Sequence, residues 1–426
     1  MLPRGPILIT GCGIAGPVLA LLLHQKGYKV IVFDKVSQPG DAGASLMLMS
    51  NGLKVLDLVG VAAAATAQSI PIDAFIDRTS TGHLLGTSQL PSSFPKKYSH
   101  PLTGIKRTSL HLLLRESLLQ RGIDVRQGWT LLGFEEDERE GSVTAHFDGD
   151  RRVAGSILVG CDGIKSATRA AMLRLGGVAE PSPLYTGLTQ TAGIAKTPPD
   201  MSSAAAMRNW YGDGIHVISY PISETHTSWA MTRREAQETT ESWRPYRPDE
   251  LPQQRAQLCA LLQGWDRAVL DMVGSSERII KFGLFDRQEL RPDQWFSRRS
   301  VLVGDAAHPT SPHLGQGANQ ALEDCYHLSQ AFPNLHALKD EDNDADSDAD
   351  TVAPFGPGIA GTIFRPFAEK RQPRTAHLVR GARLQGDQRV VAGQESCRVR
   401  DGLIVDKFAD SQQLADRFDE LLREPF

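Results

Sequence analysis

The ten residues at positions 7–16 read Ile-Leu-Ile-Thr-Gly-Cys-Gly-Ile-Ala-Gly, and a second apolar run, Val-Ile-Val-Phe, leads to Asp34. This order predicts a strand, a glycine turn, a helix and a second strand that ends in a carboxylate. Gly11 permits the tight turn, Gly13 lets the backbone approach a pyrophosphate, and Gly16 lets the helix pack closely on the sheet. Asp34 follows at the distance at which an acidic side chain accepts a hydrogen bond from a ribose hydroxyl. We therefore expect the chain to bind the adenylate half of a dinucleotide.

The context of the glycine motif decides against a turn that binds nothing. The segment from Val18 to Lys26 contains no glycine or proline, and Gly27 is a typical helix stop. A complete strand, helix and strand around the motif favours a ligand. NAD fits this unit as well as FAD does, so the rest of the chain must decide between them.

Composition restricts the class of protein. The 426 residues are enough for two or three domains, and 41% hydrophobic with 23% charged residues is typical of a globular enzyme. A formal charge of −4 gives no basic field for nucleic acid. The five cysteines form no C-x-x-C pair, and we find no metal-binding motif. With no long apolar run and no leader before the first strand, we expect a cytoplasmic protein that binds no membrane, as a monomer or homodimer.

The order of elements predicts an α/β fold with interleaved domains. A Rossmann-like dinucleotide domain is built from three segments, and a β-rich domain is inserted between them. Residues 233–275 within the insertion look helical, and the chain ends in helices. The expected ranges are 1–71, 101–182 and 278–385 for the dinucleotide domain, 72–100 and 183–277 for the inserted substrate domain, 337–361 for a flexible acidic and Pro/Gly-rich loop, and 386–426 for a C-terminal helical segment.

Two further glycine–acid motifs follow the first. Residues 159–166 read Val-Gly-Cys-Asp-Gly-Ile-Lys-Ser, and residues 303–309 read Val-Gly-Asp-Ala-Ala-His-Pro, continuing through Pro-His-Leu-Gly-Gln-Gly-Ala-Asn at 312–319. The three motifs, in this order, resemble the single-component FAD-dependent aromatic monooxygenases of the para-hydroxybenzoate and salicylate hydroxylase type. The resemblance covers most of the chain from residue 7 to about 385, and the branch of fungal secondary metabolism is the nearest in character.

The resemblance implies an FAD enzyme that uses NADPH or NADH as a transient co-substrate. The reduced flavin of this family adds O2 at C4a, and the resulting hydroperoxide delivers one oxygen atom to an aromatic or heteroaromatic small molecule, by hydroxylation or epoxidation. Asp305 would accept from ribityl hydroxyls, and the glycine loop would place a helix N-terminus near the flavin pyrimidine ring. The expected cofactor residues are Gly11, Gly13, Ile14, Ala15, Gly16, Asp34, Lys35, Arg107, Asp162, Gly163, Gly304, Asp305, Pro312, Gly315, Gln316, Gly317, Ala318 and Asn319. For Asp162, a structural cap on the turn is the alternative.

Candidate substrate residues come from the β-rich insertion and the loop after the second strand. They are Arg208, Tyr211, His216, Tyr220 and Asp41, of which a Tyr or His can deprotonate a phenol. Packing, or a solvated loop for the acid, is the plainer interpretation of each. Relatives carry an arginine near the flavin here, but none lies between Lys35 and Lys54.

Two alternatives share the fold. One is an FAD-dependent oxidoreductase that inserts no oxygen, and the other is a non-catalytic FAD- or prenyl-binding relative. The intact Asp-Gly and Gly-Asp pairs argue against the second. A halogenase would carry a W-x-W-x-I-P signature, which the sequence lacks.

Overall fold

A computed structural model describes residues 5–38, 40, 43–238, 244–337 and 358–426. Its first layer is a parallel sheet of five strands in the order β19-β12-β1-β2-β8. The strands are β1 (Ile7–Thr10), β2 (Val30–Asp34), β8 (Asp124–Gln127), β12 (Ile157–Gly160) and β19 (Ser300–Leu302). They come from three distant parts of the chain, as the sequence predicted, and their core strands are continuous apolar runs because both faces are covered.

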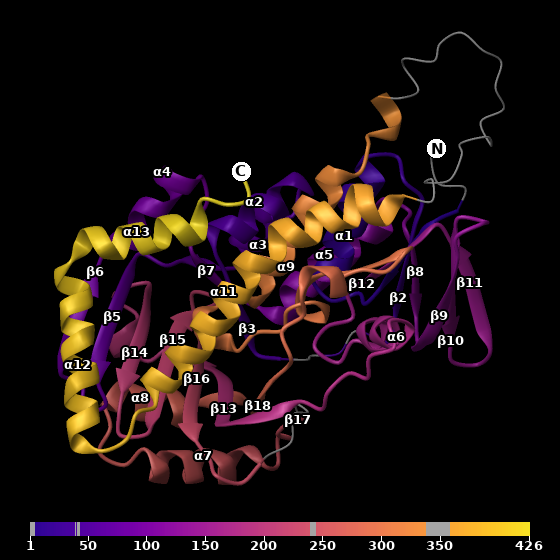
Figure 1. The fold of residues 1–426 in the computed structure, drawn as a ribbon. Helices are drawn as coiled ribbons and strands as arrows, with labels where there is room; N and C mark the ends of the chain where they lie inside the picture. The colour runs from indigo at the N-terminus through magenta and orange to yellow at the C-terminus, as the bar shows by residue number, and fades with distance from the viewer. Residues whose placement is uncertain (1–4, 39, 41–42, 239–243, 338–357) are drawn as a thin grey trace.

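Helices cover one face of this sheet, and a small antiparallel sheet covers the other (Figure 1). The helices are α1 (Ala15–Gln25), α2 (Ser50–Leu58), α3 (Ala62–Ala67), α5 (Arg107–Gln120) and α9 (Gly317–Ala331). The small sheet consists of β9 (Leu131–Asp137), β10 (Ser142–Phe147) and β11 (Arg151–Gly155). It packs on β2 through the stacked rings of Phe33 and Phe147, whose centroids are 4.4 Å apart. Helix α6 (Ala167–Leu175) follows β12.

The β-rich insertion forms an eight-stranded sheet in the order β17-β18-β13-β16-β15-β14-β5-β6. Its strands are β5 (Ala74–Thr79), β6 (Leu84–Ser88), β13 (Leu184–Lys196), β14 (Ala206–Tyr211), β15 (Ile215–Pro221), β16 (His226–Arg234), β17 (Arg244–Pro245) and β18 (Ser276–Asp286). Helices α7 (Leu251–Leu261) and α8 (Arg267–Gly274) cover one face, around the buried Trp210 and Trp229.

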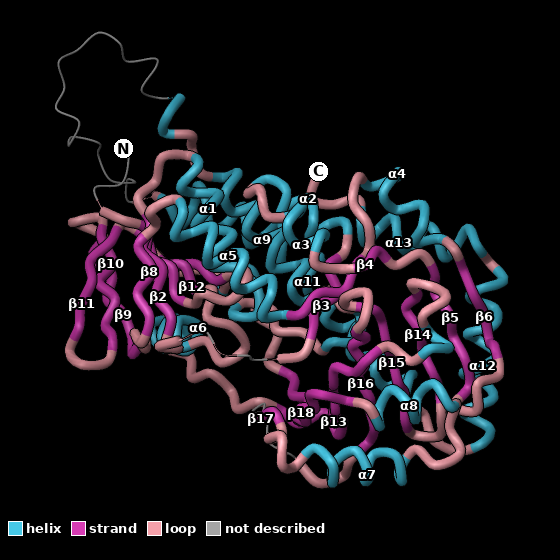
Figure 2. Tube along the Cα trace, turned by 180° about the vertical axis from the view of Figure 1, so that it is seen from behind, coloured by secondary structure: helices cyan, strands magenta, loops and turns pink. Residues whose placement is uncertain are grey.

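A third sheet and the C-terminal helices join the two large layers. The sheet contains β3 (Ser45–Leu48), β7 (Thr103–Lys106) and β4 (Ile70–Pro71). Helix α11 (Arg365–Arg389) runs from the parallel-sheet layer across to the large sheet, as both views show (Figures 1 and 2). Helix α12 (Gln394–Ala409) then lies along β6, and α13 (Ser411–Leu422) returns towards α2 and the short α4 (Phe94–Tyr98).

Some sequence expectations differ from the structure in detail. Strand β18 runs to Asp286 and pairs with β13, so the large sheet continues past the boundary expected at residue 277. The stretch 233–275, which we expected to be helical, also contains the end of β16 and the short β17. Most of the loop expected at 337–361 lies outside the described residues. Within the described ranges, no helix has the length and apolar character needed to cross a membrane.

Candidate active site

Three strand ends bring the sequence motifs together. Strands β1, β12 and β19 are parallel neighbours, so the residues that follow them lie at one edge of the sheet. Contact between the first two motifs is direct, because a Cβ added at Gly11 would lie 2.3 Å from the carbonyl oxygen of Cys161. Ligands of open α/β sheets bind at this edge.

The first glycine turn leaves room where a pyrophosphate would lie. Gly11 has a φ of +93°, and a Cβ at Gly16 would lie 1.9 Å from the carbonyl oxygen of Gly11, so both positions require glycine. Gly13 is different, because no described atom beyond its neighbours comes within 4 Å of an added Cβ. Helix α1 begins at Ala15 after Ile14, and no described side chain caps its N-terminus. Its free N–H groups are therefore available to an anion.

Asp34 stands beside this turn. Its carboxylate accepts a hydrogen bond from the backbone N–H of Cys12 at 2.6 Å and another from that of Val36 at 2.7 Å. An ionised carboxylate has about four acceptor positions, so Asp34 can also accept from a ribose hydroxyl. The adjacent Lys35 is exposed.

Asp162 serves the local structure. One carboxylate oxygen accepts from the Ser166 hydroxyl, and the other accepts from the backbone N–H and the hydroxyl of Thr168, each at 3.0 Å. Burial raises the pKa of Asp162, and these hydrogen bonds oppose the shift. The structure therefore shows the capping role that we named as the alternative. Gly163 follows with a φ of +77° and an open side.

Asp305 lies on a concave surface. Its side chain is exposed, yet surrounding protein desolvates the carboxylate enough to raise its pKa, against the opposing effects of His308 and Arg107. A side chain that lines a cleft can be both accessible to solvent and partly desolvated by the surrounding protein. Arg107, the first residue of α5, is close enough for its charge to interact with Asp305, and burial lowers its pKa. A carboxylate and a guanidinium meet here from strand ends that are far apart in sequence.

The glycine loop ends at the same place. The turn η5 (Pro312–Leu314) leads to Gly315 at a φ of +63°, and α9 begins at Gly317. A Cβ at Gly317 would lie 3.8 Å from a carboxylate oxygen of Asp305, so the N-terminus of α9 faces this cleft. Ala318 follows in the first turn, which contains no acidic residue.

Asn319 and Gln316 hold the loop from inside. Asn319 is completely buried, accepts from the N–H of Met49 at 3.0 Å, and donates to the carbonyls of Met47 and Gly315. The buried Gln316 accepts from Asn51 at 3.0 Å. Both side chains therefore tie the start of α9 to β3 and α2, and they fix the backbone of the loop.

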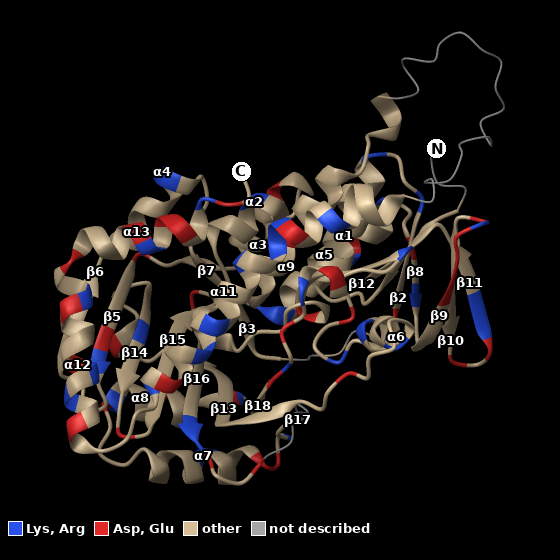
Figure 3. Cartoon of the chain, viewed as in Figure 1, with Lys and Arg blue, Asp and Glu red and all other residues tan. Residues whose placement is uncertain are grey.

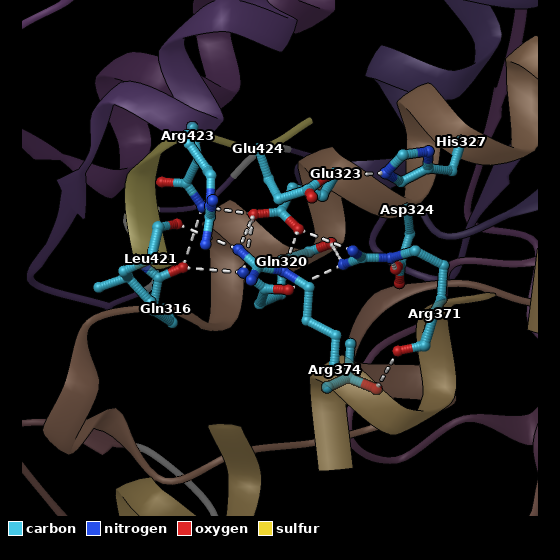
Figure 4. Close-up of polar contacts among 12 residues, drawn as sticks. Gln316, Gln320, Glu323, Asp324, His327, Arg371, Arg374, Leu421, Arg423 and Glu424 are labelled. Atoms are coloured by element: carbon cyan, nitrogen blue, oxygen red, sulfur yellow. Dashed lines mark hydrogen bonds and ion pairs between the residues drawn. The ribbon is translucent and has the colours of Figure 1, made fainter. Parts of the chain in front are cut away.

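A buried ionic cluster supports this edge from behind (Figure 4). Arg371 of α11 contacts Glu323 and Asp324 of α9, both at 2.7 Å, and all three side chains are at most 1% exposed. Asp324 also accepts from the N–H of Gly304 at 2.9 Å and contacts the His308 ring at 2.5 Å. Burial alone would raise the pKa of Asp324, but His308 and Arg371 outweigh it and hold that pKa well below its usual range. The cluster locks α11, α9 and the end of β19 together.

These residues fit FAD. The uncapped N-terminus of α1 with the open side of Gly13 suits the pyrophosphate, Asp34 the adenosine ribose, and Asp305 with Arg107 the ribityl chain. The N-terminus of α9 is placed to stabilise negative charge on the pyrimidine ring.

The large sheet faces this cleft with partly exposed residues at its centre. Tyr220 of β15 marks the facing side, because its hydroxyl is 2.6 Å from that of Ser45, the first residue of β3. Side chains alternate along strands, so Ile218 shares this side, and Ala230 of β16 pairs directly with it. Ile218, Tyr220 and Ala230 are only half-buried although strands flank them on both sides. Solvent therefore reaches the space beside this face of the sheet.

Tyr211 and His216 lie on the same side, at a closed end of this space. They are direct cross-strand partners, and their ring centroids are 4.8 Å apart. His216 is 1% exposed, and burial, together with Arg389, His313 and Arg400, lowers its pKa well below its ordinary value.

Two other candidate substrate residues need correction. Arg208 pairs with Ser219 on the opposite side of the sheet, where its guanidinium donates to the carbonyls of Met201, Ala204 and Ala206. It therefore does not face the cleft. Asp41 lies outside the described residues.

Sequence reasoning did not single out Asp77, Asn209 and Ser45, whose side chains hydrogen-bond to Tyr211, His216 and Tyr220, respectively. Asn209 is two residues from Tyr211 in β14, so strand alternation would have placed it on the cleft side and Arg208 on the other. Asp77 lies beside Asn209 because β5 and β14 pair in parallel. That pairing is not visible in the local sequence. Ser45 joins Tyr220 and Ser228 by hydroxyl hydrogen bonds of 2.6 Å.

Comparisons with known proteins identify the family of the chain. The FAD binding domain family matches residues 4–340. The 3-amino-4-hydroxybenzoate 2-monooxygenase PtnB3 of Streptomyces platensis is 32% identical over 93% of this chain and 92% of its own length. The 3-hydroxybenzoate 6-hydroxylase of Polaromonas naphthalenivorans is 26% identical over 89% and 87%. Klebsiella pneumoniae HpxO with FAD and uric acid has the same fold, with a TM-score of 0.78, 20% identity, and coverage of 98% and 96%.

The chain belongs to the FAD binding domain family, and it is a flavin-dependent monooxygenase of aromatic compounds. This confirms the expected fold class, cofactor and reaction class, and it excludes the non-catalytic relative that the sequence had left open.

Proposed function

We propose that this enzyme hydroxylates a small aromatic ring that already carries a hydroxyl group, with NADPH or NADH as reductant. The substrate ring lies between the Pro312–Gly317 loop and the half-buried residues Ile218, Tyr220 and Ala230. The observation that carries this proposal is the incomplete burial of these residues at the centre of a sheet. The relatives named for hydroxybenzoates support the same class of substrate.

The side chains around this space prepare it for the reaction. Bound FAD supplies the electron transfer and the activation of O2. The sheet and the glycine loop exclude water from the ring, and Tyr220, Ser45 and Ser228 offer hydroxyls that orient its polar groups. His216 and Tyr211 lie at the end where a substrate hydroxyl would be held.

The ring of His216 is neutral at that end. Burial first, and then the charges of Arg389 and Arg400, lower the pKa of His216. A phenol that donates a hydrogen bond to a neutral imidazole gains electron density on its oxygen, so such a contact activates the ring for electrophilic oxygen.

A direct experiment supplies the FAD-loaded enzyme with NADPH or NADH, 18O2 and a panel of hydroxybenzoates. We expect faster nucleotide oxidation with at least one isomer, and a product that carries a single 18O atom by mass spectrometry. Rapid nucleotide oxidation that yields only hydrogen peroxide with every isomer would instead support the oxidoreductase that inserts no oxygen.

The location of the ring has its own test. Ile218→Trp fills the space, so we expect KM for the best isomer to rise at least about tenfold while FAD remains bound. Leu132→Trp, on an exposed strand of the small sheet, is the matched control and should leave KM unchanged. An unaffected KM in Ile218→Trp would place the substrate elsewhere.

A further inference from the structure

A chain of buried polar groups leads from Asp77 to His216. Asp77 of β5 is 1% exposed and accepts a hydrogen bond from the amide nitrogen of Asn209 at 2.7 Å. The amide oxygen of Asn209 is 3.0 Å from Nε2 of His216. Asn209 is 4% exposed, so water does not compete for these bonds.

The chemistry of the three groups decides the direction of every bond. An ionised carboxylate only accepts, so the NH2 of Asn209 must face Asp77. The amide oxygen then faces His216, and an oxygen can only accept, so Nε2 carries the proton. A neutral imidazole has one N–H, which leaves Nδ1 as a lone-pair acceptor.

We propose that Asp77 and Asn209 are positioning residues that hold His216 in the Nε2-protonated form, so that Nδ1 accepts a hydrogen bond from the substrate hydroxyl. The pair thereby makes the enzyme specific for aromatic rings with a hydroxyl or amino donor. This inference rests on the proposed function and adds to it the residues that recognise the substrate hydroxyl.

The surroundings keep the histidine neutral and place a cation beside Asp77. Lys407 of α12 lies 3.3 Å from Asp77 and compensates its buried charge, and the Tyr211 hydroxyl donates to the same oxygen at 3.2 Å. Burial first, and then the charges of Arg389 of α11 and Arg400 of α12, disfavour the protonation of His216. The ring of His216 is therefore neutral near pH 7, with one nitrogen free to accept.

The position of His216 suits that task. It precedes Ile218 by two residues on the cleft side of β15, and His313 belongs to the turn that leads into the glycine loop. The histidine thus lies where the sheet and the flavin loop meet. No bond forms or breaks in this step beyond the hydrogen bond to Nδ1.

The wild-type test measures the tautomer itself. In the FAD-loaded enzyme without substrate, 15N NMR of labelled histidine, with His216→Gln to assign the signal, should show Nε2 protonated and Nδ1 unprotonated. A protonated Nδ1 overturns the proposal. This measurement needs no substrate, so it can fail independently of the proposed function. Failure of the proposed function would instead appear as a lack of turnover with every hydroxybenzoate.

A second arm tests the role of Asp77. Asp77→Asn can offer either an oxygen or an NH2 to Asn209, so the tautomer of His216 is no longer fixed. We expect loss of the single wild-type tautomer, and a rise of about tenfold in Kd of the best hydroxybenzoate, measured by flavin fluorescence. Kd of the corresponding methoxybenzoate, which cannot donate, should stay the same.

Two comparisons complete this arm. Asp200→Asn, an exposed acid after β13, is the matched control and should change neither the tautomer nor either Kd. An unchanged tautomer with an unchanged ratio of the two Kd values in Asp77→Asn overturns the proposal. Should that variant fail to fold, the wild-type tautomer decides alone.

Discussion

Two glycines at the cleft, Gly16 and Gly13, lack a side chain for different reasons. A methyl group at Gly16 collides with backbone, whereas a methyl group at Gly13 meets no described atom within 4 Å. Glycine at position 13 therefore has no packing reason within the described chain. Its small size is explained by a ligand that passes close to the backbone.

Gly13→Ala should consequently weaken FAD binding and leave the apoprotein intact. We expect the Tm of the apoprotein to stay within about 2 °C, since surface changes rarely exceed 0.5 kcal/mol. Kd for FAD, measured by calorimetry, should rise at least about tenfold, because the methyl group occupies the space of the pyrophosphate.

The control for this change is Gly402→Ala in α12, which also meets no described atom within 4 Å and lies outside the cleft. It should leave Kd for FAD unchanged. Equal effects of the two alanines on FAD binding would contradict our placement of the pyrophosphate.

The buried His313 makes the folding stability depend on pH. Burial, reinforced by Arg389 and Arg383, lowers the pKa of His313 to about 3. Below pH 6.5 the unfolded chain takes up a proton at this residue and the folded chain does not, so stability falls as the pH falls towards 3. At pH 5 this loss is about 2 kcal/mol for one such histidine.

Urea unfolding of His313→Asn at pH 7.5 and pH 5 measures this effect. The loss of unfolding free energy between the two pH values should be smaller than in the wild type by roughly that amount. His83→Asn, at an exposed position, should keep the wild-type difference. If His313→Asn lost as much unfolding free energy between the two pH values as the wild type does, His313 would have to be protonated equally in the folded and unfolded chains.

At the scale of elements, the buried ionic cluster connects α9 and α11 next to the flavin edge. Arg371→Met removes two buried ion pairs, one with Glu323 and one with Asp324, and leaves those carboxylates only Arg374 and His308 as ionic partners among the described residues. Breaking a buried pair in this way costs about 3–5 kcal/mol, because the remaining charge is not solvated. We expect a loss of that size in the free energy of unfolding, measured in urea.

Arg380→Met is the matched control in the same helix. Arg380 pairs with Glu289 at 2.8 Å, but the two side chains are 64% and 42% exposed. Exposed pairs contribute about 0–1 kcal/mol, so this variant should remain close to the wild type. Similar losses in both variants would mean that α11 is held by its apolar contacts rather than by the cluster.

Sequence patterns predict some of these elements well and others poorly, for physical reasons. The glycine turns and continuous apolar strands of the parallel sheet are local signals, so β1, β2, β12 and β19 were foreseeable. Strand β18 mixes charged and apolar residues and owes its place to pairing with β13, which is not visible locally. Arg208 was misassigned because its residue type outweighed the alternation that sends it to the far side.

For the whole molecule, charge is mixed over the surface and the architecture carries the function. Basic and acidic side chains are interspersed along the visible elements (Figure 3). The sequence indicated one edge of the molecule because all three motifs follow strands of one sheet. It could not locate Asp77 and Asn209, because their role depends on a pairing between strands about 130 residues apart.

The central claim is that three strand ends hold one FAD, with Asp305 as the ribityl acceptor. Calorimetric titration of the apoprotein with FAD tests this most directly. We predict one FAD per chain for the wild type, a Kd at least about tenfold higher for Asp305→Ala, and wild-type binding for Asp293→Ala, whose carboxylate is exposed outside the cleft. Wild-type affinity in Asp305→Ala would contradict the account.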